Sequence, residues 1–283
     1  MATTSSGATV DRWVENAAPD LRTRRRLDLR ELWAYRELVW FFAARDVKVR
    51  YKQTALGAVW AVVQPVAGSI VFTVVFRRLA RVPSDGVPYL VFAFAGMAAW
   101  SYISASLNAA TMSLVGNVSL VTKVWFPRIA APVAAVLPGL VDLGISLVLL
   151  AVLMAVTGVV PSLALVFLPL CVAGFVVLAL GFGLALATYN VEYRDVKNVI
   201  GLLIQLWLFA SPVAYPSSLV KGAWRYLYAV NPMAGLLDLF RWSTLGTPAP
   251  GLPLLVSLAS MAAISAFGLR SFLKAERRFA DVI

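Results

Sequence analysis

The chain alternates between long apolar runs and short polar segments. The runs that carry almost no charge cover about 54–76, 87–114, 129–160, 163–189, 198–213 and 252–269. A helix needs about 20 consecutive apolar residues to cross the hydrocarbon core. The pattern therefore predicts an all-α polytopic membrane protein with six transmembrane helices. The run 198–213 is short for a crossing, whereas 129–160 contains Pro132 and Pro138 and is long enough to require a kink or a portion at the interface. Only residues 158–162 connect it to the next run, which predicts a tight hairpin.

The segments outside these runs have distinct patterns. Residues 1–28 are polar and basic, lack the apolar centre of a signal peptide, and are predicted to be disordered in the cytoplasm. Over 29–50, apolar residues recur at helical spacing, which predicts an amphipathic helix on the inner membrane surface. Residues 214–251 hold four prolines but are too apolar for a free loop, so we expect short external helices that re-enter the outer leaflet. Residues 274–283 form a cytoplasmic C-terminus in this topology.

Composition and charge support the membrane prediction. The 283 residues are 60% hydrophobic and 14% charged, with a mean hydropathy of +0.80. Of the 25 Lys and Arg residues behind the net charge of +11, eleven lie in the first 52 positions. That bias favours cytoplasmic termini and contact with anionic lipid, and it argues against nucleic acid as the partner.

Few residues could perform catalysis or bind a metal. The chain has no His and a single Cys171, so no metal site is predicted. No P-loop motif occurs, so another subunit must hydrolyse any nucleotide that drives transport. The apolar runs contain essentially one ionisable residue, Asp142, which is either a proton or cation site or a polar contact near a helix end. The second interpretation is favoured, because proton-coupled transporters usually need several such groups. We predict no catalytic residue and no cofactor in this chain.

Two helix faces combine small, amide and aromatic side chains at helical spacing. The first comprises Gly57, Trp60, Gln64, Gly68 and Phe72, and the second comprises Asn198, Gly201, Gln205 and Phe209. Both faces fit close helix packing. They equally fit a pathway whose amides and rings contact sugars.

The segment 116–128 lies between two apolar runs but retains Trp125, Phe126 and a single cation, Lys123. It fits either a short helix docked against another protein or an interfacial helix whose aromatic rings lie at the headgroups.

Several ordered segments together resemble one family. They are 45–60 (RDVKVRYKQTALGAVW) followed by Gln64-Pro65, 113–127 (SLVGNVSLVTKVWFP), 193–196 (YRDV), Ser211-Pro212 with Tyr215-Pro216, Asn231-Pro232-Met233 and 279–281 (FAD). With these segments the chain resembles the membrane subunits of type-2 ABC exporters for lipid-linked polysaccharide, namely O-antigen, capsule and teichoic acid permeases.

The resemblance implies an assembly and a location. The permease would be a homodimer in the bacterial cytoplasmic membrane that carries two copies of a cytosolic ATPase, which binds the ATP and Mg²⁺. The substrate would be a glycan linked to undecaprenyl diphosphate.

The resemblance also implies roles for individual residues. Residues 117–126 would form the coupling helix, and the ATPase-coupling residues would be Asn117, Ser119, Leu120, Val121, Lys123, Trp125, Phe126, Pro127 and Arg128. The interface helix would contribute Arg36, Glu37, Arg45 and Asp46, and a cytoplasmic gate would contain Glu192, Arg194 and Asp195. Candidates at the entrance for the lipid diphosphate are Lys48, Arg50, Tyr51 and Lys52, although ordinary positive-inside anchoring explains the cations as well. Candidate channel-lining residues are Trp60, Gln64, Phe72, Gln205, Trp207 and Phe209.

Two alternative functions stay open. A type-2 ABC permease for small lipophilic compounds would share the architecture. A membrane-embedded enzyme of lipid or glycan synthesis would need clustered acids, and its only candidates are Glu192 and Asp195, which are flanked by Arg194 and Lys197.

Overall fold

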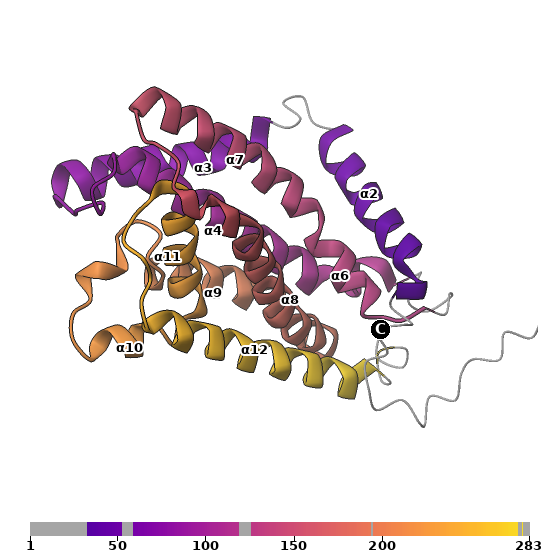
Figure 1. The fold of residues 1–283 in the computed structure, drawn as a ribbon. Coiled ribbons are helices and arrows are strands. Elements are labelled where there is room, and N and C mark those ends of the chain that lie inside the picture. The colour runs from indigo at the N-terminus through magenta and orange to yellow at the C-terminus, as the bar shows by residue number, and fades with distance from the viewer. Residues whose placement is uncertain (1–32, 53–58, 119–125, 194, 277–278, 280–283) are drawn as a thin grey trace, which may run out of the picture.

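The computed structural model describes residues 33–52, 59–118, 126–193, 195–276 and 279, and all regular structure in these ranges is helical (Figure 1). Five helical segments are long and apolar enough to cross a membrane: Val59–Leu79, Tyr89–Met112, Ala130–Thr157, Leu163–Glu192 and Pro253–Ala275. This confirms the all-α polytopic prediction. The sixth predicted crossing corresponds to α9 (Val196–Ala210), which is apolar but has only 15 residues, so the count of six stays a prediction.

The first helices follow the apolar runs closely. α2 (Arg36–Lys52) falls within the predicted interface helix, whose residues 29–32 lie outside the described ranges. α3 (Val59–Phe72) continues into η1 (Thr73–Leu79), a π-helical stretch that carries the crossing beyond the predicted end at Phe76. α4 (Tyr89–Met112) is followed by the single 3₁₀ turn η2 (Val115–Asn117).

The long third run is divided as its prolines suggested. α6 (Ala130–Val136) and α7 (Pro138–Thr157) are separated at Leu137, because Pro138 has no N–H and its ring clashes with the preceding turn. α7 ends at Gly158, whose φ of 74° lies in the left-handed region that glycine adopts without strain. Ser162 then caps the next element by accepting the Ala164 N–H at 3.1 Å. That element is η3 (Leu163–Phe167), which leads into α8 (Leu168–Glu192).

The segment after α9 contains the short helices predicted there. They are η4 (Ser217–Leu219), α10 (Trp224–Tyr228) and α11 (Pro232–Leu245). Asn231 caps α11 by accepting the Met233 N–H at 3.1 Å, and Pro232 occupies the first turn, where its missing N–H costs nothing. Most of α11 is buried, which explains the apolar composition of a segment interrupted by prolines. α12 (Pro253–Ala275) follows.

α4 forms the centre of the bundle and is buried along most of its length against α3, α7 and α8. α8 packs closely along α12, because a Cβ on Gly268 would lie 1.9 Å from the Gly181 carbonyl oxygen. α2 contacts α6 and lies at the end of the bundle where α12 ends, whereas α10 lies at the opposite end (Figure 1). The two ends of the bundle therefore carry different elements, α2 at one end and α10 at the other.

Candidate functional site

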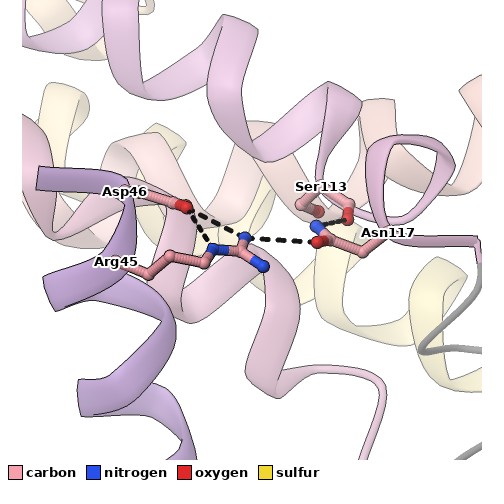
Figure 2. Close-up of polar contacts among 4 residues, drawn as sticks. All are labelled: Arg45, Asp46, Ser113 and Asn117. Carbon is pink, nitrogen blue, oxygen red and sulfur yellow. Dashed lines mark hydrogen bonds and ion pairs between the residues drawn. The ribbon is translucent and has the colours of Figure 1, made fainter. Parts of the chain in front are cut away.

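The interface helix and the start of the predicted coupling segment meet directly (Figure 2). On α2, the Arg45 guanidinium donates through Nη2 to Asn117 Oδ1 at 3.2 Å and through Nε to Asp46 Oδ1 at 2.9 Å. The Asn117 amide nitrogen in turn donates to the Ser113 carbonyl at 2.8 Å. Arg45 also lies over the Phe42 ring, 5.3 Å from its centroid. Arg45 is therefore fixed by its own helix on one side and by Asn117 of η2 on the other.

A hydrophobic cluster adjoins this junction through Phe42. The Phe42 and Phe126 rings meet edge to face with centroids 5.9 Å apart. The buried members of the cluster are Phe42, Leu114, Phe126, Ile129, Ala130, Ala131, Ala134, Leu184, Ala187, Val191, Phe272, Ala275 and Phe279. Phe126 and its neighbour Pro127 are both buried within the chain itself. They connect the end of the coupling segment to α2 and α12.

The far end of the predicted coupling segment is held by the end of α12. The Arg128 N–H donates to Glu276 Oε1 at 3.2 Å, and the Arg128 guanidinium donates to the Glu276 carbonyl. The remaining predicted coupling residues, Ser119, Leu120, Val121, Lys123 and Trp125, lie outside the described residues. The described flanks of this segment are therefore joined to α2 through Asn117 and to α12 through Arg128.

Arg36 and Glu37, predicted for the interface helix, do not join the junction. They form an exposed ion pair at 3.9 Å near the start of α2, with side chains 54% and 90% exposed. Exposed pairs of this kind contribute little stability.

The C-terminal end of α2 contacts α7 through Asp142. Arg50 forms an ion pair with one oxygen of this carboxylate, and the Tyr51 hydroxyl donates to the other. Burial and the hydrogen bond to Asp142 raise the pKa of Tyr51 to about 12, so the phenol stays protonated and donates at neutral pH. Asp142 is thus the polar contact favoured above, and its charge is paired.

Arg50, Tyr51 and Asp142 border a pocket of about 340 Å³ that is lined by polar and apolar side chains. The polar and aromatic residues that line it are Arg50, Tyr51, Trp60, Gln64, Ser101, Tyr102, Asp142 and Ser146. The pocket joins two predicted groups, because Arg50 and Tyr51 come from the entrance and Trp60 and Gln64 from the first channel-lining face. Lys48 and Lys52 are exposed on α2 and are not among its lining residues.

Sequence analysis did not identify Ser101, Tyr102 and Ser146. Isolated hydroxyls within long apolar runs follow no period that distinguishes a pocket from ordinary helix packing. Their placement depends on which helices are neighbours.

The other channel-lining candidates are dispersed. Phe72 is 9% exposed and packs edge to face on Phe76 at 5.6 Å, away from the pocket. Trp207 is half-buried: its indole N–H donates to Asn231 Oδ1 at 3.0 Å. Gln205 and Phe209 lie on the exposed side of α9.

The predicted gate residues lie between α8 and α9. Glu192 is exposed at the end of α8, Asp195 is exposed just before α9, and Arg194 lies outside the described residues. Within the described ranges, no three His, Cys, Asp or Glu residues gather closely enough to hold a metal ion.

Arg241 on α11 is a further residue that sequence analysis missed, and it is only 2% exposed. Its guanidinium donates to the carbonyls of Pro212 at 2.5 Å and Val213 at 2.6 Å, and it lies 3.6 Å from the centroid of the Phe92 ring. These carbonyls follow the end of α9, so Arg241 connects α9, α11 and α4. A cation within a largely apolar helix was the available signal.

Comparison with known proteins places this architecture in a family. A family model described as ABC-2 type transporter matches residues 37–245. An O-antigen export system permease protein RfbA from Myxococcus xanthus is 29% identical over 258 residues, covering 90% of this chain and 98% of the relative. A protein of the same name from Klebsiella pneumoniae is 27% identical, covering 84% and 92%. The polysialic acid transport protein KpsM of Escherichia coli is 21% identical, covering 70% and 77%. Since the family model spans most of the chain and its apolar helices suit a multi-pass membrane protein, the chain belongs to the ABC-2 type transporter family.

Proposed function

We propose that this chain is the permease subunit of an ATP-driven exporter that moves a lipid-linked polysaccharide across the bacterial cytoplasmic membrane. One observation carries the proposal: relatives named as O-antigen export permeases align over nearly the whole of this chain and of their own length. The relative named for polysialic acid transport also handles a polysaccharide. The shared substrate class is therefore a long glycan, whatever its sugars.

The energy for transport would come from a separate cytosolic ATPase present in two copies. This chain contains no P-loop with which to bind ATP. The ATPase would dock on α2 and on the segment 117–126. Bonds from Asn117 to α2 and from Arg128 to the end of α12 support this assignment, because a displacement of the segment would pull on both helices.

Two copies of the permease would form the channel. α9 has only Ile200 buried, and Leu202, Leu206 and Phe209 are 58%, 57% and 57% exposed. An apolar helix face of this kind must be covered by lipid or by protein. The amide of Gln205 on the exposed side of α9 favours protein or a polar pathway over lipid.

The carrier would approach from the cytoplasmic end. Lys48 and Lys52 are exposed on α2 and suit the diphosphate of an undecaprenyl carrier, whereas Arg50 is already paired with Asp142. Glu192, Arg194 and Asp195 would lie at the cytoplasmic gate, with both termini on the same side.

The test is deletion of the chromosomal gene, followed by complementation with the wild-type chain. We expect loss of surface polysaccharide and accumulation of lipid-linked glycan inside the cell, both restored by the complementing gene. The tagged protein should copurify with an ATPase whose hydrolysis responds to glycan-bearing undecaprenyl lipid. An ATPase that responds only to small amphiphiles would instead support a permease for lipophilic compounds. Normal surface polysaccharide in the deletion strain would refute the proposal.

A further inference from the structure

The pocket between α2, α3, α4 and α7 is lined by both polar and apolar side chains, and its lining residues carry no net formal charge. Its two charged residues, Arg50 and Asp142, form an ion pair with each other, and Tyr51 donates to the same carboxylate. The exposed cations Lys48 and Lys52 are not among the lining residues. A diphosphate in this pocket would therefore meet no uncompensated positive charge. The lining favours a neutral ligand.

The pocket also contains hydroxyls that make no well-formed hydrogen bond. Ser101 Oγ and Tyr102 OH are buried, and within the described part of the chain neither has a partner of good hydrogen-bond geometry, while the Ser106 hydroxyl lies close to that of Tyr102. Leaving a buried hydroxyl unpaired costs free energy, which a ligand hydroxyl or a bound water recovers. Gln64 and Ser146 add an amide and a third hydroxyl to the same lining. The set matches a ligand with several hydroxyl groups.

The lining also contains the indole of Trp60. Trp60 borders the pocket and leaves 56% of its surface exposed. An indole offers a flat apolar face together with a polar N–H, so it can stack against the C–H face of a sugar ring. The volume of about 340 Å³ lies at the small end of the range for small-molecule sites, about 300–1,000 Å³. This size suits one or two sugar residues.

We propose that this pocket binds one neutral sugar ring, the ring attached to the lipid carrier, and that Ser101 and Tyr102 provide its hydrogen bonds. The inference rests on the proposed function and deepens it. The exposed lysines of α2 contact the diphosphate, and the neighbouring pocket binds the first sugar. A membrane glycolipid presents the same chemistry, so the experiment distinguishes the two sources.

The test measures lipid affinity of the full-length permease in nanodiscs. The probes are undecaprenyl diphosphate alone, the same lipid bearing one N-acetylglucosamine, glucose or galactose, and glucosyl diacylglycerol. We expect at least one of the sugar-bearing carriers to bind about tenfold more tightly than the bare carrier. The combined variant Ser101→Ala, Tyr102→Phe should reduce this advantage to about twofold and leave affinity for the bare carrier unchanged.

A matched control tests the location of the effect. Ser104 lies on the same helix, its hydroxyl donates to the Ser101 carbonyl at 3.2 Å, and it is not among the lining residues. Ser104→Ala should keep the full advantage of the sugar-bearing carrier. The thermal midpoint of each variant shows whether it is folded, and Tyr102→Phe alone serves as a near-isosteric variant if the double variant is unstable.

The outcomes separate the two proposals. Equal affinity for bare and sugar-bearing carriers, or an advantage that survives the double variant, would overturn the sugar site while leaving export untouched. Such a result would mean that water alone pairs the two hydroxyls. A third outcome is that glucosyl diacylglycerol binds and the double variant weakens this binding, while the sugar-bearing carrier binds no more tightly than the bare carrier. This outcome would overturn the lipid carrier as the source of the sugar. Loss of export is measured separately in the deletion strain, so failure of the function is distinguishable.

Discussion

At the scale of single residues, a charge within an apolar run depends on partners that are remote in the sequence. Asp142 obtains its cation from Arg50, which lies 92 positions earlier. Sequence could show that Asp142 needs a partner, because an unpaired carboxylate at membrane depth is costly. It could not show which cation would reach it, since that depends on α2 lying against α7.

Removing the charge of Asp142 should therefore destabilise the link between α2 and α7. We expect Asp142→Asn to lower the free energy of unfolding by about 1–2 kcal/mol, because a hydrogen bond to a charged group is lost at a partly exposed site. The measurement is the thermal midpoint of the purified permease in nanodiscs. Glu37→Gln, which breaks only an exposed pair, serves as the control and should change the midpoint little. Equal midpoints for Asp142→Asn and the wild type would contradict the structural role.

The contact between Arg45 and Asn117 leads to a prediction about coupling. Arg45→Ala and Asn117→Ala should each reduce the glycan exported per ATP hydrolysed, because either change breaks the link between α2 and the coupling segment. Since both side chains share one hydrogen bond, the double variant should be about as impaired as either single variant.

The measurement is export and hydrolysis by the reconstituted permease and ATPase, with Arg36→Ala as the matched control on the same helix. Additive losses in the double variant would show that the two residues act separately.

At the scale of elements, hydropathy predicts what depends on local sequence. The apolar runs place the helices, Pro138 explains the break before α7, and residues 158–162 form the short connection that their length required. The burial of α11 was harder to predict from the sequence, because its fourteen residues are too few to cross a membrane and include a cation. The position of Arg241 follows only from the way α9 ends: the carbonyls of Pro212 and Val213 lie beyond its last turn and need a donor.

Arg241 should therefore be more sensitive to substitution than any exposed cation. Arg241→Lys retains the charge but loses the planar group that reaches two carbonyls and stacks on Phe92 together. We expect a loss of about 3 kcal/mol or more, comparable to breaking a buried charge interaction. The thermal midpoint and the yield of folded protein measure it. Arg78→Lys, at an exposed position near the end of η1, is the control and should behave as the wild type.

At the scale of the whole molecule, the distribution of exposed apolar surface bears on assembly. Lipid covers apolar residues on any outer helix, so exposure alone does not identify an interface in a membrane protein. α7 and α9 both expose apolar side chains: Val148 on α7 is 67% exposed and Leu202 on α9 is 58% exposed. The two differ in their neighbours, because the exposed side of α9 also carries Gln205. An amide is better satisfied against protein than against hydrocarbon.

This difference yields a test of the proposed homodimer. Cys171 is buried and is the sole cysteine in the sequence, so Cys171→Ser gives a background in which a new thiol is unique. In membranes treated with a short bifunctional maleimide, Leu202→Cys should give a dimer-sized product, because in the proposed homodimer the α9 faces of two copies would meet across the channel. Val148→Cys, equally apolar and exposed but on α7, should stay monomeric. If both positions crosslinked alike, the products would reflect random collision, and crosslinking at Val148 alone would place the second copy on α7 and remove α9 from the channel.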